Sequence, residues 1–162
     1  MGRAINPEEL SKLLTTAAGN IGGSLEKAIK LCCTKIQSDI QESMSNTQLD
    51  MSKSYYTNNK TKAHHPSLPG NPPAPDTGNL RKSIRYEVHE EGKEVYGLVG
   101  STQKDPPYGA YLEYGTSKDE PRPLLEPRPL LEPRPWLRPA MRENEGFVRN
   151  AIAQAVRESL VK

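Results

Sequence analysis

A chain of 162 residues is long enough for one domain, and its composition limits what that domain can be. Hydrophobic residues make up 34% and Phe occurs once, so the core must be small. The net charge of +2, from 22 basic and 20 acidic residues, lacks the basic excess typical of a protein whose main partner is nucleic acid. No apolar run could cross a membrane and no secretory signal opens the chain, so we expect cytosolic synthesis and no membrane partner.

Residues 1–46 predict one long amphipathic helix. Asn6 and Pro7 form a start signal, an N-cap residue followed by proline in the first turn. Apolar residues then recur every three or four positions up to Met44. Such a helix, about 50 Å long, is too long for one small domain to bury. We therefore expect its free part to pack on a neighbouring subunit, and Ile36 and Ile40 to be buried at that interface or in the core.

Three glycines interrupt the apolar pattern of this helix, at positions 19, 22 and 23. Each costs about 1 kcal/mol relative to Ala in a helix interior. The sequence therefore predicts a break or kink near residue 20. Further along the same helix, Cys32 and Cys33 point about 100° apart, so they are expected to be buried small side chains that do not bridge each other.

A proline-rich loop is predicted over residues 62–76. Its prolines at 66, 69, 72 and 75 fall at intervals of three, the period of a polyproline II helix. The spacing also matches the PxxP form that adaptor domains bind, and this alternative stays open. The turn Asp76-Thr77-Gly78 follows and precedes a short helical segment, Asn79 to Ser83.

Residues 79–116 predict a β-hairpin followed by an aromatic turn. Apolar and polar side chains alternate from Ile84 to His89, and after a turn the alternation resumes at Val95. Tyr108 to Tyr114 then forms a short helix or turn. A lone Glu113 among aromatic residues is expected to be a structural hydrogen-bond acceptor, not a catalytic base.

Residues 117–139 form a proline-rich repeat arm. One hexad occurs almost unchanged three times, as Glu120–Leu125, Glu126–Leu131 and Glu132–Leu137. Because proline fixes φ and restricts the preceding residue, the repeat predicts a polyproline II rod of roughly 60 Å. Leu124, Leu130 and Trp136 share its apolar edge and are expected to contact a partner subunit or protein. A flexible linker is the alternative.

Residues 140–162 predict a C-terminal amphipathic helix. The expected fold is α+β, one domain over residues 1–162 in which a long N-terminal helix and a C-terminal helix pack on a small antiparallel sheet, with extended proline-rich loops. No group of residues has the spacing of a catalytic, cofactor or metal site. We therefore expect neither an enzyme nor a cofactor.

The chain runs in order through Pro75–Ile84, a β-hairpin, Tyr108–Thr116 and Pro135–Ala140. This succession resembles the small neck proteins of long-tailed double-stranded DNA phages, variously called head-tail joining, tail-completion or minor tail proteins. The resemblance covers roughly residues 5–160. The chain departs from the pattern through two additional Glu-Pro-Arg-Pro-Leu-Leu units, and through Trp136 where Phe is usual. The motif residues are Asp76, Thr77, Gly78, Leu80, Tyr111, Glu113, Tyr114, Gly115, Thr116, Arg134, Pro135, Trp136, Arg138 and Pro139.

The resemblance implies a structural virion protein of the neck or upper tail, assembled in the host cytoplasm as a ring, hexameric to match the tail, around the DNA passage. Implied partners are neighbouring neck and tail proteins such as a stopper, tail terminator or tail tube. Duplex DNA is a further implied partner, bound without sequence specificity. Because the net charge is nearly balanced, any contacts with DNA must come from locally placed cations, and Lys53, Lys60 and Lys62 in the polar stretch are the candidates. Two alternatives remain open, a tail terminator and a cytosolic adaptor that presents proline-rich segments.

Overall fold

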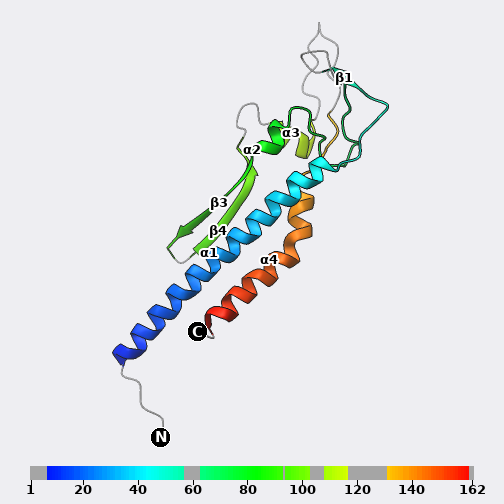
Figure 1. Cartoon of the computed structure of the whole chain (residues 1–162). Coiled ribbons are helices and arrows are strands. Elements are labelled where there is room, and N and C mark those ends of the chain that lie inside the picture. The colour runs from blue at the N-terminus through cyan, green and yellow to red at the C-terminus, as the bar shows by residue number, and fades with distance from the viewer. Residues whose placement is uncertain (1–6, 57–62, 93, 103–107, 117–130, 161–162) are drawn as a thin grey trace. The chain divides into compact units, whose positions relative to one another are not determined.

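The computed structural model describes residues 7–56, 63–92, 94–102, 108–116 and 131–160. Figure 1 labels the helices and strands within these ranges. In chain order they are α1 (Pro7–Ser45), β1 (Tyr55–Tyr56), β2 (Ala63–His64), α2 (Asn79–Ser83), β3 (Ile84–Glu91), β4 (Glu94–Ser101), α3 (Tyr108–Tyr114) and α4 (Leu137–Leu160). Strands β3 and β4 form one hydrogen-bonded pair and β1 and β2 another. The predicted α+β class is confirmed, with a long helix near each end of the chain and small antiparallel pairs between them.

The chain divides into two compact units. The first holds Met1–Lys35, Tyr86–Leu98 and Asn144–Lys162. The second holds Ile36–Arg85 and Val99–Glu143. Helices α1 and α4 and strands β3 and β4 each contribute to both units. The expectation of a single domain over residues 1–162 stays a prediction.

In the first unit, the β-hairpin backbone lies directly against α1. A Cβ atom at Gly97 of β4 would overlap Cys33 Sγ and come 2.9 Å from Ile29 Cγ2. Cys32 and Cys33 are both buried and unbridged, as predicted, and burial raises the pKa of each thiol. On α4, the Phe147 ring lies 5.8 Å from the Lys35 ammonium, within range of a cation–π contact.

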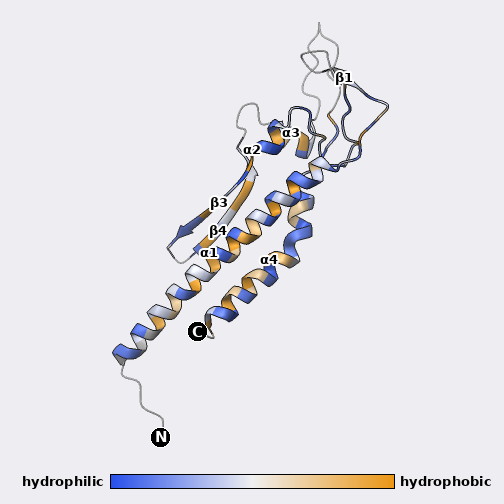
Figure 2. Ribbon diagram, in the orientation of Figure 1, coloured by the Kyte–Doolittle hydropathy of each residue, from blue (hydrophilic) through white to orange (hydrophobic). Residues whose placement is uncertain are grey.

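The predicted break near residue 20 is wrong, because α1 is continuous from Pro7 to Ser45. Figure 2 shows it as one ribbon on which hydrophobic and hydrophilic positions alternate. Apart from the adjacent residues and the backbone of the helix itself, no described heavy atom lies within 4 Å of the Cβ position of any of its three glycines. The glycines therefore lower helix propensity without interrupting the helix.

The core of the second unit is built on the last turns of α1. Ile40 is 0% exposed and Ile36 is 4% exposed, so neither side chain has surface left for a partner. This corrects the expectation of an interface position and confirms the alternative of a core position. The Gln37 side chain donates to the Ile84 carbonyl at 2.8 Å, and the Gln41 side chain to the Arg81 carbonyl at 3.1 Å. These bonds fix α1 to the start of β3 and to α2.

The loop after α1 is a long irregular hairpin, not a rod. Tyr55 pairs with His64, and a further bridge joins Leu49 to Ser67. The chain then turns at Gly70, whose φ is 82°, and the Asn71 N–H donates to the Leu68 carbonyl at 3.1 Å. Proline followed by a positive-φ glycine is the arrangement of a type II turn. The predicted polyproline II rod through these prolines is therefore wrong at Gly70.

Candidate functional site

The centre of the second unit is a contact between α3 and the first turn of α4. Glu113 of α3 is 6% exposed. One carboxylate oxygen accepts hydrogen bonds from the backbone N–H groups of Trp136 at 2.7 Å and Leu137 at 3.0 Å, and the other accepts from the Arg138 N–H at 3.1 Å. Pro139 follows and has no N–H to satisfy. Glu113 thus caps α4 from outside the helix, as the sequence predicted for a structural acceptor.

Trp136 is held by a second contact with α3. Its indole Nε1–H donates to the Gly109 carbonyl at 2.9 Å, and the side chain is 4% exposed. A Cβ at Gly109 would lie 3.2 Å from Trp136 Cζ2 and 3.2 Å from Leu80 Cδ1. Because Trp136 is buried within its own unit, the expectation that it contacts a partner is corrected.

A third contact joins Thr116, directly before the repeat arm, to Leu131 at the end of its second hexad. The Thr116 N–H donates to the Leu131 carbonyl at 3.0 Å, and the Leu131 N–H donates to the Thr116 hydroxyl at 3.2 Å. Gly115, with φ of 75°, leaves room for this contact, since a Cβ there would lie 2.6 Å from the Leu131 carbonyl oxygen. The hexads at 120–131 lie almost wholly outside the described residues, and so do Leu124 and Leu130. The predicted rod through these two hexads therefore stays a prediction.

The third hexad is held from both sides. The Arg134 N–H donates to the Leu112 carbonyl at 2.7 Å, and the Arg134 side chain reaches the Ser67 carbonyl at 3.2 Å. The Pro133 carbonyl accepts from the Gly70 N–H at 2.9 Å. This hexad therefore contacts both α3 and the irregular hairpin, and its Pro135 is half-buried. We call the contacts of Glu113, Trp136 and the Thr116–Leu131 pair the α3 clasp.

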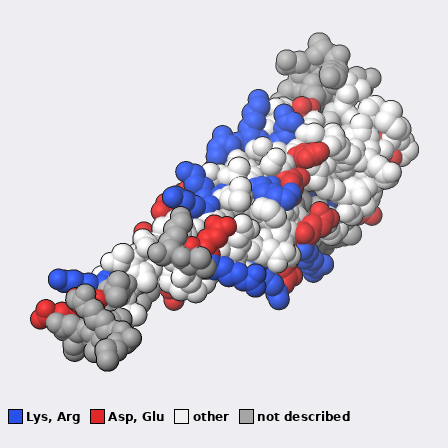
Figure 3. All heavy atoms as spheres, turned by 60° about the horizontal axis from the view of Figure 1, so that its bottom comes forward, with Lys and Arg blue, Asp and Glu red and all other residues white. Residues whose placement is uncertain are grey.

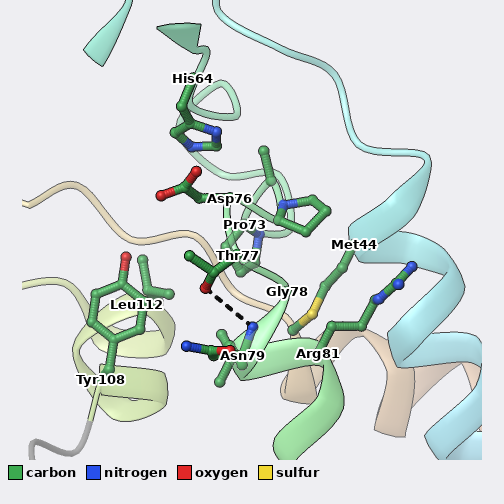
Figure 4. Close-up of a pocket in the computed structure, with 13 residues that line it drawn as sticks. Met44, His64, Pro73, Asp76, Thr77, Gly78, Asn79, Arg81, Tyr108 and Leu112 are labelled. Atoms are coloured by element: carbon green, nitrogen blue, oxygen red, sulfur yellow. Dashed lines mark hydrogen bonds between the residues drawn. The ribbon is translucent and has the colours of Figure 1, made fainter. Parts of the chain in front are cut away.

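The turn before α2 lines a pocket of about 300 Å³. Figure 4 shows His64, Asp76 and Tyr108 around it, with Met44 and Arg81 on another side. Gly78 has φ of 74° and its carbonyl accepts from Lys82 N–H, while the Thr77 hydroxyl accepts from Asn79 N–H at 3.4 Å. Of the motif residues in this turn, Leu80 is buried in the core, whereas Asp76 and Thr77 are exposed at the surface.

Two tyrosines of the aromatic motif face away from the core. Tyr111 is 45% exposed and Tyr114 is 62% exposed. The Arg138 guanidinium lies 4.4 Å from the centroid of the Tyr114 ring and 3.9 Å from the Glu113 carboxylate. Arg138 therefore links the exposed ring to the buried cap.

The structure thus joins motif residues from separate segments into one site. Sequence reasoning missed three of its members, Gly109, Leu112 and Ser67, which contribute backbone carbonyls or close contacts. The signal available for Gly109 was a glycine inside a predicted helix, where glycine is unfavourable unless something approaches closely. No comparable signal marked Leu112 or Ser67.

The chemistry of the described residues is that of packing and recognition. They contain no group of three or more His, Cys, Asp or Glu side chains that could hold a metal ion. In the same part of the chain, no helix combines the length and apolar composition needed to cross a membrane.

Comparison with known families identifies the class of protein. Residues 8–115, from α1 through α3, match the family described as "Bacteriophage HK97-gp10, putative tail-component". The match covers about two thirds of the chain, so the chain belongs to this family of phage tail components. No curated protein and no solved structure gives a match.

Membership makes the chain a structural, tail-related component of the virion. The matched segment ends at Gly115, inside the α3 clasp. The repeat arm and α4 follow it, and the clasp fixes both to the matched part.

Proposed function

We propose that the chain is a neck protein that completes the phage tail or joins it to the head, and that it forms a ring around the DNA passage. The family match supports a tail-related role. One observation supports assembly with other copies, and it concerns the first half of α1.

This half of α1 has no buried side chain among those described. Leu14 is 62% exposed, and Ala28 is the first buried residue along the described side chains of the helix. The segment before Ala28 is about 30 Å long and contains three glycines, each costing about 1 kcal/mol relative to Ala. In proteins most helical stability comes from packing of an amphipathic face against other structure. Packing against another copy would supply the missing apolar contact.

The ring proposal follows from the need for a repeated contact. A surface of one copy that meets a different surface of the next gives a closed ring when the rotation closes. We propose six copies to match the tail, with a stopper, tail terminator or tail tube protein as neighbours. Virion neck or upper tail is the corresponding location, after assembly in the host cytoplasm.

The test replaces one apolar side chain on the free part of α1. Leu14→Asp should convert the oligomer into monomers, measured by light scattering, because a charge would be buried without a partner. Thr16→Asp is the matched control, since it adds the same charge about 200° away around the helix. Retention of an oligomer by the Leu14→Asp variant would contradict the proposed contact.

Two alternatives give different results. A cytosolic adaptor that presents proline-rich segments would be monomeric in its wild-type form. A tail terminator would also form rings, but its loss would leave tails of uncontrolled length, whereas loss of a completion protein would leave tails of normal length that do not join heads. Electron microscopy of particles from a phage lacking the gene separates these two outcomes.

A further inference from the structure

A second hollow of the second unit is lined by cationic side chains. Its volume is about 410 Å³, and its lining residues come from three elements. They are Gln41 of α1, Arg81 and Lys82 of α2, and Arg85 of β3. We call these four residues the basic hollow. Three positive charges thus occur within five consecutive positions of a chain whose net charge is +2.

The backbone and side chains of the basic hollow are held in place. Gln41 donates to the Arg81 carbonyl at 3.1 Å, and the Arg81 guanidinium donates to the Ser45 hydroxyl at 2.8 Å. The Arg85 guanidinium donates to the Ile84 carbonyl at 3.0 Å. Each guanidinium carries five N–H donors, so most of the donors of each Arg remain available to a ligand.

The positive charge of the basic hollow is not neutralised within the described part of the chain. Its lining contains no Asp or Glu. Ion pairs in the described part of the chain, such as Lys53 with Asp50, Arg138 with Glu113 and Arg149 with Glu145, involve other cations. Figure 3 shows basic and acidic side chains interspersed on one face of the molecule. A local excess of this kind attracts anions although the whole chain is nearly neutral.

We infer that the basic hollow binds the phosphate backbone of duplex DNA. The inference rests on the proposed ring around a DNA passage and names the residues that would face the DNA. Arg forks match phosphate oxygens, and such contacts carry no sequence information. The lining has no apolar or aromatic side chain, so an acidic protein segment would find charge there but no buried anchor of the kind that dominates protein interfaces.

The basic hollow also replaces the earlier candidates for DNA contact. The Lys53 ammonium lies 3.6 Å from the Asp50 carboxylate. The pKa of Asp50 is lowered, first by the hydrogen bond from the Ser52 side chain and also by Lys53, so the negative charge of Asp50 is favoured beside Lys53 and offsets it. Lys60 and Lys62 lie outside the described residues.

The experiment measures binding of a mixed-sequence duplex at several salt concentrations. In the full-length protein, Arg81→Gln, Lys82→Gln and Arg85→Gln are combined. The logarithm of affinity falls with the logarithm of salt by about 0.9 for each phosphate contacted, so the slope should become shallower by up to about 2.7 per subunit. The matched control combines Lys27→Gln, Lys30→Gln and Arg157→Gln, three exposed cations of the first unit, and should change the slope much less.

The outcomes separate this inference from the proposed ring. If the triple variant keeps the wild-type oligomer by light scattering yet binds the duplex with an unchanged slope, the inference is overturned and the ring proposal stands. If the wild type is monomeric but the triple variant still binds the duplex with a shallower salt dependence than the wild type, the ring proposal fails and the inference stands. Preference of the hollow for polyglutamate over the duplex would overturn it in favour of an acidic protein segment. Saturation by inorganic phosphate with no duplex binding would overturn it in favour of a free anion.

Discussion

The carboxylate of Glu113 accepts a hydrogen bond from the backbone N–H of Trp136 at 2.7 Å, across 23 positions of sequence. Glu113 belongs to the family-matched segment and Trp136 to the part that follows it. Because the same carboxylate also accepts from the next two N–H groups, it determines where α4 begins. The helix starts at Leu137, three residues before the predicted start at Ala140.

Replacing Glu113 with Gln tests this cap. The amide offers one acceptor oxygen in place of two and turns a donor toward the N–H groups of α4. Hydrogen bonds to charged groups contribute about 1.5–3 kcal/mol each, so the free energy of unfolding should fall by about 2–3 kcal/mol in chemical denaturation. Glu143→Gln, an exposed change on the same helix, should alter it by less than about 0.5 kcal/mol. Equal stability of the two variants would show that Glu113 does not act as a cap.

Trp136 distinguishes the third hexad from the first two, which carry Leu at the matching position. Trp136→Phe keeps an aromatic ring but leaves the Gly109 carbonyl without its donor, at a cost of about 1–3 kcal/mol. Trp136→Leu also removes ring volume and should cost more, approaching the roughly 3–5 kcal/mol of full truncation. Far-UV circular dichroism during denaturation measures both.

A surface aromatic provides the control for Trp136. Tyr111→Leu changes a side chain that is 45% exposed and should cost less than about 1 kcal/mol. If Trp136→Phe proved as stable as the wild type, the bond from Nε1 to Gly109 would contribute nothing to the clasp.

The sequence predicted the elements in which hydrophobic residues recur with a clear period. It did not predict contacts with backbone groups that are far away in the sequence. The 3.6-residue period of α1 and the alternation around Ile84 were sufficient for the long helix and the hairpin. The glycines suggested a break that does not occur, since their intrinsic cost is modest beside the cooperativity of a 39-residue helix. Strands β1 and β2 have two residues each, too few for any period to show.

The candidate site was predicted as a set of residues but not as an arrangement. The role of Glu113 as an acceptor was inferred correctly, yet its donors lie in another motif and no local pattern names them. The basic hollow was missed for a different reason. Arg81 and Lys82 lie in α2 and Arg85 lies at the start of β3, so no single element shows a run of basic residues. The nearly balanced net charge of the chain also gave no reason to look for a local basic cluster.

Gly97→Ala tests the close contact between the hairpin and α1. The new methyl group would overlap Cys33 Sγ, and overpacking of this kind typically costs about 1–3 kcal/mol. Gly100→Ala in the same strand has nothing within 4 Å among the described residues and should change stability by less than about 0.5 kcal/mol. The double variant with Cys33→Ala should recover part of the loss, as a double-mutant cycle would show. Additive effects of the two changes would argue against the contact.

Shortening the repeat arm tests what the spare hexads do. Deleting Glu126–Leu131 gives the same chain as deleting Glu120–Leu125, because the two hexads are identical, so Thr116 still meets a leucine followed by the third hexad. Stability should change by about 0.5 kcal/mol or less, since loop length acts only logarithmically. Tail attachment should nevertheless fall if Leu124 and Leu130 contact a neighbour, and electron microscopy of assembled particles measures this.

A four-residue deletion tests whether the length of the arm matters or the direction in which its side chains point, because four residues are not a whole number of polyproline II turns. On a free polyproline II rod, removing four residues would rotate Trp136 away from the apolar edge. In the structure Trp136 is fixed by Glu113 and Gly109, so its position cannot depend on the phase of the arm. Deleting Arg122–Leu125 should therefore leave stability as unchanged as the six-residue deletion does. Residues 117–130 separate Thr116 from Leu131 in the sequence, and each deletion shortens that segment. Normal particles from both deletions, and from removal of both spare hexads, would mean that the arm is a tether without a partner.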